Sequence, residues 1–415
     1  MRAAERAVLV GLAWGARRAE AEATLEELAL LAESAGAEVA ARVLQERQRP
    51  DPASFVGSGK LAEIGRAAEE AGAQLVLFDD PLSPAQQRNL ERALERKVLD
   101  RSQLILDIFA QRARSREGRL QVELAQLENL LPRLAGKGIM LSRLGGGIGT
   151  RGPGETKLET DRRRIRTRIQ VLRRELEHVG RVRHTQRRGR SRQGAPVVAL
   201  VGYTNAGKST LFNALTGAAA RADDRLFMTL DPLFRRVELK GGPQVLLVDT
   251  VGFIRKLPHG LVASFRATLE EVVEADLLLH VVDGAAEAHE AQATAVRQVL
   301  AEIGAQAVPQ LLVFNKLDLL EPARAGLLAQ AHPEALLVSS RSGAGLELLK
   351  ARLVERLDLS LRVVRLRLPA GGEQLAGLFA LGRVLSQEQV GDDQVEVEAE
   401  VPNRWLARFE EYRIA

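Results

Sequence analysis

The sequence predicts an α/β protein of several domains, and three features support this fold class. Apolar runs of strand length alternate with longer amphipathic segments from residue 8 onward. A glycine-rich loop connects the apolar run 197–201 to the helix-patterned stretch 210–216. Two leucine-rich segments repeat their apolar residues at spacings of three and four, as paired helices do. A chain of 415 residues can form about two to four domains with cores of their own.

The N-terminal part of the chain predicts an α/β domain. A strand at 8–11 precedes an amphipathic helix at 19–34, a strand near 39–45, a helix at 60–70 and a strand at 75–78. The sequence Gly57-Ser58-Gly59-Lys60 superficially resembles a phosphate-binding loop. It lacks the upstream glycine and has Leu61 in place of the hydroxyl residue, so a plain loop-to-helix turn is the favoured interpretation.

Composition and the start of the chain bear on the compartment. The stretch 1–16 has the basic residues and apolar run of a short signal peptide, but its apolar part fits the first strand better. No run approaches the roughly 18 apolar residues of a membrane-spanning helix. The chain has no cysteine, which excludes disulfides and thiolate metal sites. We therefore expect a cytosolic protein.

Residues 202–209 match the phosphate-binding loop pattern GxxxxGK[ST] between a strand and a helix. The glycines of such a loop let successive backbone N–H groups face the α- and β-phosphates, and the helix N-terminus adds its positive dipole. Lys208 is expected to reach the bridge between the β- and γ-phosphates, and Ser209 to offer its hydroxyl to Mg²⁺. The loop alone is also compatible with an ATPase, a kinase or a chance match.

Two downstream segments predict contacts to the metal and the γ-phosphate. The motif Asp249-Thr250-Val251-Gly252 ends the apolar run 245–248, where a carboxylate holds the metal through water and a glycine N–H meets the γ-phosphate. Thr229 lies between the loop and Asp249, where a switch segment places a threonine on the metal. Its order along the chain makes Thr229 the candidate for the second protein ligand of Mg²⁺.

A third motif selects the base. Asn315-Lys316-Leu317-Asp318 closes the apolar run 311–314, and Ser339-Ser340-Arg341 closes the run 335–338. The carboxylate of Asp318 can accept hydrogen bonds from N1–H and the N2 amino group of guanine, whereas adenine offers neither donor. A buried polar group that loses its hydrogen-bond partner costs about 1–3 kcal/mol. Roughly hundredfold discrimination of guanine over adenine is therefore expected. The motifs in this order predict GTP as the substrate and Mg²⁺ as the cofactor.

The predicted site residues form two sets. The candidates for GTP binding are Gly202, Tyr203, Thr204, Asn205, Ala206, Gly207, Lys208, Ser209, Phe227, Met228, Thr229, Leu230, Asp231, Asp249, Thr250, Val251, Gly252, Asn315, Lys316, Leu317, Asp318, Ser339, Ser340 and Arg341. The candidates for Mg²⁺ are Ser209 and Thr229.

Phe253 stands where many GTPases carry the glutamine that orients the attacking water. Phenylalanine cannot orient water, so no catalytic residue is assigned. We expect slow hydrolysis by the isolated protein and large stimulation by a partner. Arg221, Arg225 and Arg255 are near enough in sequence to act as an internal arginine finger, although solvated arginines are commoner in such loops.

The basic charge is concentrated in one stretch. The net charge is +5, and the stretch 161–192 alone carries thirteen arginines against Asp161, Glu175 and Glu177, a local charge of +10 that leaves −5 elsewhere. Such a patch is typical of a polyanion-binding surface. Apolar seams at 120–134 and 165–179 predict an antiparallel helical hairpin, with Pro132 able to kink or end its first helix.

A glycine-rich stretch separates the two predicted helices, with six glycines between 145 and 154. We favour a loop that approaches RNA or nucleotide phosphates closely over a flexible linker. The RNA-binding candidates are Arg151, Arg162, Arg163, Arg166, Arg173 and Arg174. The stretch 181–193 lacks periodicity and predicts a mobile basic linker.

The domain boundaries follow from these features. We expect an N-terminal α/β domain at 1–110, a hairpin with its glycine-rich tip and basic linker at 111–193, and a P-loop GTPase domain at 194–357. The remainder, 358–415, predicts a small α+β domain, with strands at 361–368 and 395–401, a helical segment at 373–378 and a final helix from Asn403.

Several motifs together resemble the HflX family of bacterial-type GTPases. They are the glycine-rich segment 147–156, the stretch 107–113, the loop 202–210, and the sequences Thr-Leu-Asp-Pro at 229–232 and Asp-Thr-Val-Gly-Phe at 249–253. The resemblance implies binding to the large ribosomal subunit and its rRNA, with the hairpin reaching toward the peptidyl-transferase centre. It also implies splitting or rescue of stalled or hibernating ribosomes. The family's N-terminal region is linked to ATP binding, yet this sequence contains no second complete phosphate loop.

Two alternatives to a ribosome-activated GTPase stay open. One is an RNA-binding or ribosome-silencing factor that uses GTP as a conformational switch with little turnover. The other is a GTPase that serves an RNA-modifying enzyme. Stimulation by ribosomes of about a thousandfold or more would distinguish the first function from both.

Overall fold

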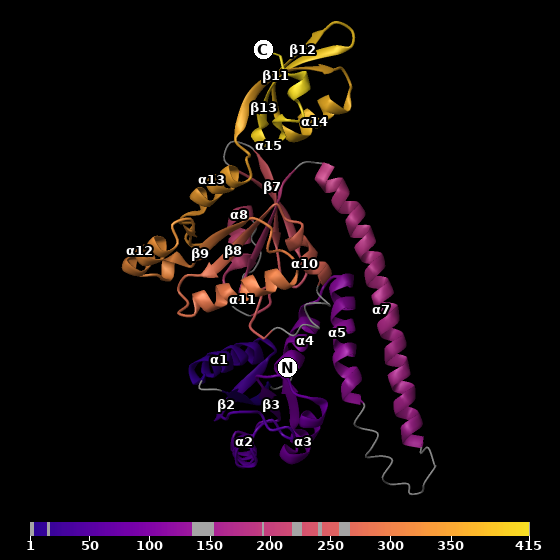
Figure 1. Cartoon of the computed structure of the whole chain (residues 1–415), viewed down its shortest axis with the longest axis vertical. Helices are drawn as coiled ribbons and strands as arrows, with labels where there is room; N and C mark the ends of the chain where they lie inside the picture. Colours follow the sequence, from indigo (N-terminus) through magenta and orange to yellow (C-terminus); the bar gives the residue numbers. More distant parts are fainter. Residues whose placement is uncertain are drawn as a thin grey trace. The chain divides into compact units, whose positions relative to one another are not determined.

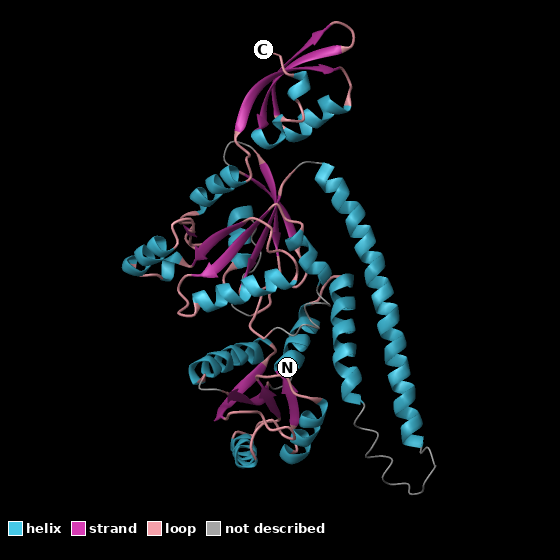
Figure 2. Cartoon of the chain, in the orientation of Figure 1, coloured by secondary structure: helices cyan, strands magenta, loops and turns pink. Residues whose placement is uncertain are grey.

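The computed structural model describes residues 4–14, 17–134, 153–192, 195–217, 226–239, 243–256 and 266–414. The chain forms two compact units. The first comprises residues 1–179 together with the segments 223–231 and 255–266, and the second comprises 180–222, 232–254 and 267–415. Helices and strands alternate in both units, as Figure 2 shows, which confirms the α/β fold class.

The first unit contains a parallel four-stranded sheet in the order β2-β1-β3-β4. Its central strand is apolar and buried from Ala7 to Ala13, as expected of a parallel strand covered on both faces. Serine and aspartate side chains cap α3 and α4 in reciprocal capping boxes. The elements are β1 (Glu5–Ala13), α1 (Arg18–Ser34), β2 (Ala37–Glu46), α2 (Ser58–Glu70), β3 (Leu75–Phe78), α3 (Pro84–Leu94), β4 (Lys97–Asp100) and α4 (Arg101–Arg112).

The predicted helical hairpin is confirmed. Helices α5 (Arg116–Leu134) and α7 (Pro153–Arg192) pack along a leucine and isoleucine seam around Leu124 and Leu172 (Figure 1). Pro132 lies inside α5, two residues before its end. Residues 145–152 of the glycine-rich tip, including Arg151, lie outside the described residues, and α7 begins at Pro153.

The prediction of a linker at 181–193 is wrong over most of its length, because α7 continues to Arg192. Arginine and glutamine are good helix formers, and a single glycine such as Gly180 is tolerated within a helix at a cost of about 1 kcal/mol. The absence of an apolar stripe there therefore did not exclude a helix.

The second unit is built on a six-stranded sheet in the order β10-β9-β8-β5-β7-β6, parallel except for β6. Its strands are β5 (Val197–Gly202), β6 (Leu233–Glu238), β7 (Gln244–Asp249), β8 (Leu277–Asp283), β9 (Gln310–Asn315) and β10 (Leu336–Leu337). Its helices are α8 (Lys208–Thr216), α10 (Arg266–Val273), α11 (His289–Glu302), α12 (Pro322–Ala331) and α13 (Leu346–Arg356).

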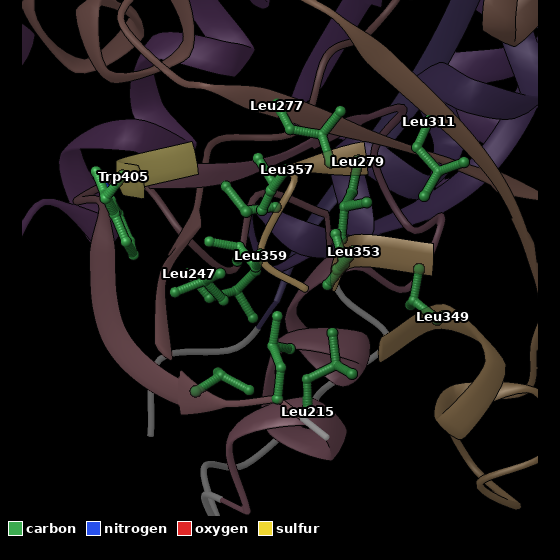
Figure 3. Close-up of a cluster of buried hydrophobic side chains, with 14 of the residues drawn as sticks. Leu215, Leu247, Leu277, Leu279, Leu311, Leu349, Leu353, Leu357, Leu359 and Trp405 are labelled. Carbon is green, nitrogen blue, oxygen red and sulfur yellow. The ribbon is translucent and has the colours of Figure 1, made fainter. Parts of the chain in front are cut away.

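A small antiparallel sheet in the order β11-β13-β12 ends the chain. Its apolar face belongs to the same buried cluster as the GTPase sheet, through Leu357, Leu359 and Trp405 (Figure 3). Strand β12 was not predicted, because almost every residue of Arg383–Val390 is exposed and no buried alternation marks it. The elements are β11 (Leu361–Pro369), α14 (Glu373–Leu381), β12 (Arg383–Val390), β13 (Gln394–Pro402) and α15 (Asn403–Leu406). No helix among the described residues is long and apolar enough to cross a bilayer.

Candidate nucleotide site

The phosphate loop begins where β5 ends and leads directly into α8. Two of its glycines are required by close contacts. A Cβ on Gly202 would lie 2.2 Å from the carbonyl oxygen of Val281, and one on Gly207 would lie 2.2 Å from Nδ2 of Asn315. Gly207 also has a φ of +87°, which disfavours other residues. The loop therefore packs directly against Asn315 of the predicted base-binding motif.

Lys208 is already oriented toward the loop. Its Nζ donates to the carbonyl oxygens of Gly202 at 3.1 Å and Tyr203 at 2.8 Å, and its side chain is buried. Burial lowers the pKa of Lys208 to about 8, and the carboxylate of Asp249 opposes that shift. A nucleotide phosphate next to this amine would favour its charged form.

Oxygen atoms that could coordinate a metal lie at the start of α8 and at the end of β7. The Ser209 hydroxyl donates to Oδ2 of Asp249 at 2.7 Å, and Asp249 is fully buried at the end of β7. Hydroxyl and carboxylate oxygens are the ligands that Mg²⁺ prefers, so this pair fits the predicted metal. Thr250 turns away from the site, because its hydroxyl donates to the carbonyl oxygen of Leu200.

The predicted guanine motif makes polar contacts with the phosphate loop and within itself. Asn315 donates through Nδ2 to the Ala206 carbonyl at 3.0 Å, and its Oδ1 accepts from the N–H and hydroxyl of Ser340. The hydroxyl of Ser339 donates to Oδ1 of Asp318. Lys316 pairs with Asp283 at 2.7 Å. The bond from Asn315 to Ala206 joins the predicted base-binding turn to the phosphate loop.

Strand-like pairing continues past β7. Phe253 donates its N–H to the Gly202 carbonyl at 3.0 Å, and its own carbonyl accepts from the Thr204 N–H at 2.7 Å. A Cβ on Gly252 would lie 2.9 Å from Nζ of Lys208, so this glycine borders the lysine directly. The Phe253 side chain is buried and offers no polar group to a water molecule.

The predicted switch residues 227–231 belong to the first compact unit. Phe227 packs its ring edge-on against Phe109, with 4.7 Å between centroids. The carboxylate of Asp231 accepts from the backbone N–H groups of Arg114 and Ser115 and from the Ser115 hydroxyl. The side chains of Phe227 and Asp231, both predicted at the nucleotide, are thus used in contacts within the first unit. Of the proposed arginine fingers, Arg221 and Arg225 lie outside the described residues.

Comparison with known proteins gives the family. Profiles described as "GTP-binding GTPase N-terminal", "GTP-binding GTPase Middle Region" and "50S ribosome-binding GTPase" match residues 22–110, 112–190 and 197–316. The GTPase HflX of Caldanaerobacter subterraneus subsp. tengcongensis is 48% identical over 398 residues, covering 96% of this chain and 91% of that protein. The chain belongs to the HflX family of GTPases. The GTPase HflX of Escherichia coli K12 is 48% identical over 371 residues, covering 89% of this chain and 87% of that protein.

One solved structure is similar to part of the chain. The crystal structure of SsGBP in complex with GDP has a TM-score of 0.49 and 26% identity, covering 85% of this chain and 98% of that one. The family predicted from the sequence motifs is confirmed, and this HflX-family chain is a GTPase.

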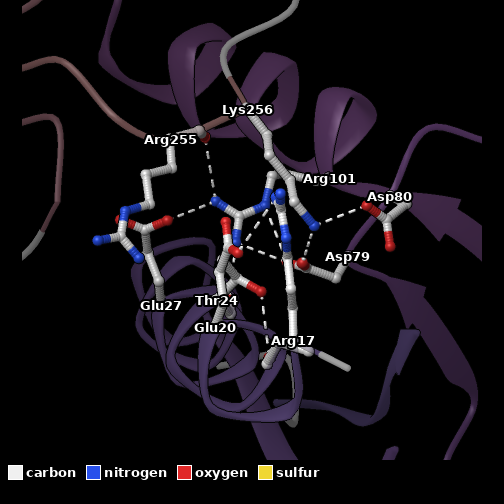
Figure 4. A network of polar contacts seen from close by, with 10 residues as sticks. Arg17, Glu20, Thr24, Glu27, Asp79, Asp80, Arg101, Arg255 and Lys256 are labelled. Carbon is white, nitrogen blue, oxygen red and sulfur yellow. Dashed lines mark hydrogen bonds and ion pairs between the residues drawn. The ribbon is translucent and has the colours of Figure 1, made fainter. Parts of the chain in front are cut away.

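One polar cluster was not predicted from the sequence: it is formed by Asp79, Asp80, Arg101 and Lys256 (Figure 4). A local signal existed, because Asp79-Asp80 directly follows the apolar run 75–78 at the carboxyl end of a predicted strand. Its partner Lys256 lies 176 residues beyond Asp80, and nothing in the sequence relates the two.

Proposed function

We propose that this HflX-family GTPase binds the large ribosomal subunit and its rRNA, is stimulated there, and helps to split or rescue stalled or hibernating ribosomes. The arginines of α7 are the observation that carries the proposal. Arg163, Arg166 and Arg174 are exposed along the helix. The match of residues 197–316 to a family described as "50S ribosome-binding GTPase" supports the same partner.

Not every predicted RNA contact is equally available. Arg173 forms an ion pair with Glu128 at 2.7 Å. Arg168 donates two hydrogen bonds to the carboxylate of Glu123, at 2.7 and 2.8 Å. These pairs join α7 to α5 and stabilise the hairpin. The arginines facing away from α5 are the better candidates for phosphate contacts, because each can approach a phosphate with its planar fork of donors.

The nucleotide site supports GTP as substrate and Mg²⁺ as cofactor. Ser209 and, from the switch segment, Thr229 would hold the metal, with Asp249 acting through its carboxylate. Mg²⁺ would supply positive charge to the β- and γ-phosphates. Lys208 binds the phosphates, Asp318 orients guanine, and the N–H of Gly252 meets the γ-phosphate. Because Phe253 has no group for water, we infer that the partner completes the arrangement for hydrolysis.

The decisive experiment measures GTP hydrolysis with and without purified large subunits, at fixed Mg²⁺ and two salt concentrations. The proposal predicts salt-sensitive stimulation of about a thousandfold. Binding without stimulation would favour the alternative of a GTP-gated silencing factor. No binding would leave the partner of an RNA-modifying enzyme as the better alternative.

A charge series tests the arm itself. Replacing Arg163, Arg166 and Arg174 by glutamine should weaken subunit binding and flatten its dependence on salt, since each lost phosphate contact removes about 0.7–0.9 of a unit from the log–log slope. The matched control replaces Arg42, Arg66 and Arg92, three exposed arginines of the N-terminal domain. Equal salt slopes for the two triple variants would contradict a role of the arm in RNA binding.

A further inference from the structure

The polar cluster missed by the sequence lies at the carboxyl edge of the N-terminal sheet. Asp79 and Asp80 follow β3, and Arg101 follows β4 as the first residue of α4. All three are buried, with exposed fractions of 2%, 6% and 1%. Open parallel sheets bind their ligands at this edge. Buried carboxylates are costly unless a positive charge or hydrogen-bond donors accompany them, so Asp79 and Asp80 need a partner.

Arg101 supplies only part of the compensating charge. Its guanidinium donates from Nη2 to Oδ1 of Asp79 at 2.6 Å, from Nη1 to Glu27 at 2.6 Å, and from Nη2 to the Thr24 carbonyl at 2.8 Å. The ammonium of Lys256 supplies the rest, with 2.6 Å to Oδ2 of Asp79 and 2.6 Å to Oδ1 of Asp80 (Figure 4). Burial raises the pKa of Asp80, and Lys256 opposes that shift.

The backbone at Lys256 is held in an uncommon conformation. Its φ is +54°, in the left-handed region that side chains with a Cβ rarely adopt. The preceding residue, Arg255, also contributes, because its carbonyl oxygen accepts from Nη1 of Arg101 at 3.3 Å. Such backbone strain persists where surrounding contacts fix it, and it concentrates at functional sites. The ion pairs with Asp79 and Asp80 are among the contacts that hold Lys256 in this conformation.

Lys256 lies three residues beyond Phe253, whose backbone pairs with the phosphate loop at Gly202 and Thr204. The short stretch between Gly252 and Lys256 is consequently anchored at both ends. Gly252, at the first end, borders the ammonium of Lys208. Moving the second anchor would shift the backbone that presents the Gly252 N–H.

We propose that Asp79 and Asp80 are positioning residues for GTP hydrolysis, which act by holding Lys256 and thereby the segment that presents Gly252 to the γ-phosphate. The ligand at this edge of the N-terminal sheet is thus a lysine of the same chain. The bonds from Ser115 and Arg114 to Asp231, two residues after Thr229, hold the other switch segment in the same way. The proposal concerns the GTPase reaction itself and does not depend on the ribosomal partner.

The test compares binding of GDP with binding of a non-hydrolysable GTP analogue, together with kcat and KM for GTP hydrolysis. Lys256→Ala and Asp80→Asn should each lower affinity for the GTP analogue about fivefold or more and reduce kcat, with GDP affinity unchanged within about twofold. Lys256→Arg, which keeps the charge, should recover part of the effect. In the double variant, Asp80→Asn should add little to Lys256→Ala, because both remove the same contact.

Lys60→Ala is the matched control, since Lys60 also pairs with an acid in this domain, Glu63 at 2.7 Å. It should leave all four quantities unchanged. An unchanged ratio of GTP to GDP affinity in the Lys256 variant would overturn the proposal. Equal weakening of both nucleotides is one form of that outcome, and a raised preference for GTP would overturn the proposal by showing that the ion pair restrains the segment instead.

Discussion

The GTPase sheet and the N-terminal sheet both place polar residues at the carboxyl ends of their parallel strands, but these residues make different contacts. In the GTPase sheet, the carboxyl ends of β5, β7 and β9 lead to Lys208, Asp249 and Asn315. In the N-terminal sheet, β3 and β4 lead to Asp79, Asp80 and Arg101. Parallel topology gathers polar residues at both edges. It does not determine what binds there.

The loop that follows the strand makes the difference. After β5 the chain has glycines where a Cβ would collide with Val281 or Asn315, so backbone N–H groups can wrap a phosphate. The sequence Gly57-Ser58-Gly59-Lys60 lies at the start of α2 without this geometry, and a Cβ on Gly59 would meet nothing within 4 Å. Lys60 there forms an ion pair with Glu63. A Gly-Lys sequence therefore indicates a phosphate-binding loop only where close packing around the loop requires its glycines.

The largest test of this comparison substitutes the two lysines. Lys208→Ala should reduce GTP and GDP affinity about a hundredfold or more, because a buried charge-assisted contact to phosphate is lost. Lys60→Ala, in the apparent second loop, should change neither. Fluorescent nucleotide titrations measure both. Weakened nucleotide binding by the Lys60 variant would show that the N-terminal turn is a phosphate site after all.

Most of the GTPase site could be predicted from the sequence, because its chemistry is local. Each motif closes a strand, and parallel strands bring their carboxyl ends together, so Lys208, Asp249 and Asn315 were expected to converge. The contacts of Asp231 and Lys256 could not be predicted. They join residues more than a hundred positions apart through ordinary ion pairs and hydrogen bonds, which leave no spacing pattern in the sequence.

The central strands of the two sheets should differ in their response to acid. Strand β8 contains His280, which is 3% exposed and whose pKa is lowered to about 4 by burial. The unfolded chain binds a proton near pH 6.5, so between pH 6.5 and 4 it holds more protons than the native state. Stability of the GTPase sheet should therefore fall as pH drops through this range, by at most about 3 kcal/mol. Strand β1 has no ionisable residue from Ala7 to Ala13.

Hydrogen exchange at several pH values, corrected for intrinsic rates, measures this difference strand by strand. His280→Leu should remove the loss of protection in β8 on acidification. His178→Gln, at an exposed histidine of α7, is the control and should leave the loss intact. If β8 and β1 lost protection in parallel in the original protein and in the His280 variant, the burial of His280 would not be the cause.

The base-binding end of the GTPase site offers a test of specificity. Asp318→Asn should lower GTP affinity about a hundredfold and make xanthosine triphosphate the better ligand, because the amide can donate to the C2 oxygen of xanthine. The bond from Ser339 to Asp318 orients the carboxylate, so Ser339→Ala should weaken guanine binding to a smaller extent without changing the preferred base. Competition assays with the two nucleotides measure both effects. Unchanged preference in the Asp318 variant would contradict the pairing with guanine.

The smallest expected effect concerns protonation of Lys208, the proposed phosphate-binding lysine. With a pKa of about 8, part of the Lys208 population is neutral in slightly alkaline solution, whereas the bound phosphate requires the ammonium. Nucleotide binding near pH 8.5 should therefore take up a fraction of a proton, and affinity should fall by about tenfold for each pH unit well above the pKa.

Calorimetric titrations in two buffers of different ionisation enthalpy measure the uptake directly. Lys60 is half-buried and paired with Glu63, and it belongs to the N-terminal domain, so Lys60→Ala should show the same proton uptake as the original protein. A binding enthalpy independent of the buffer would mean that Lys208 is fully charged before the nucleotide arrives, and that the two carbonyl contacts and Asp249 already offset its burial.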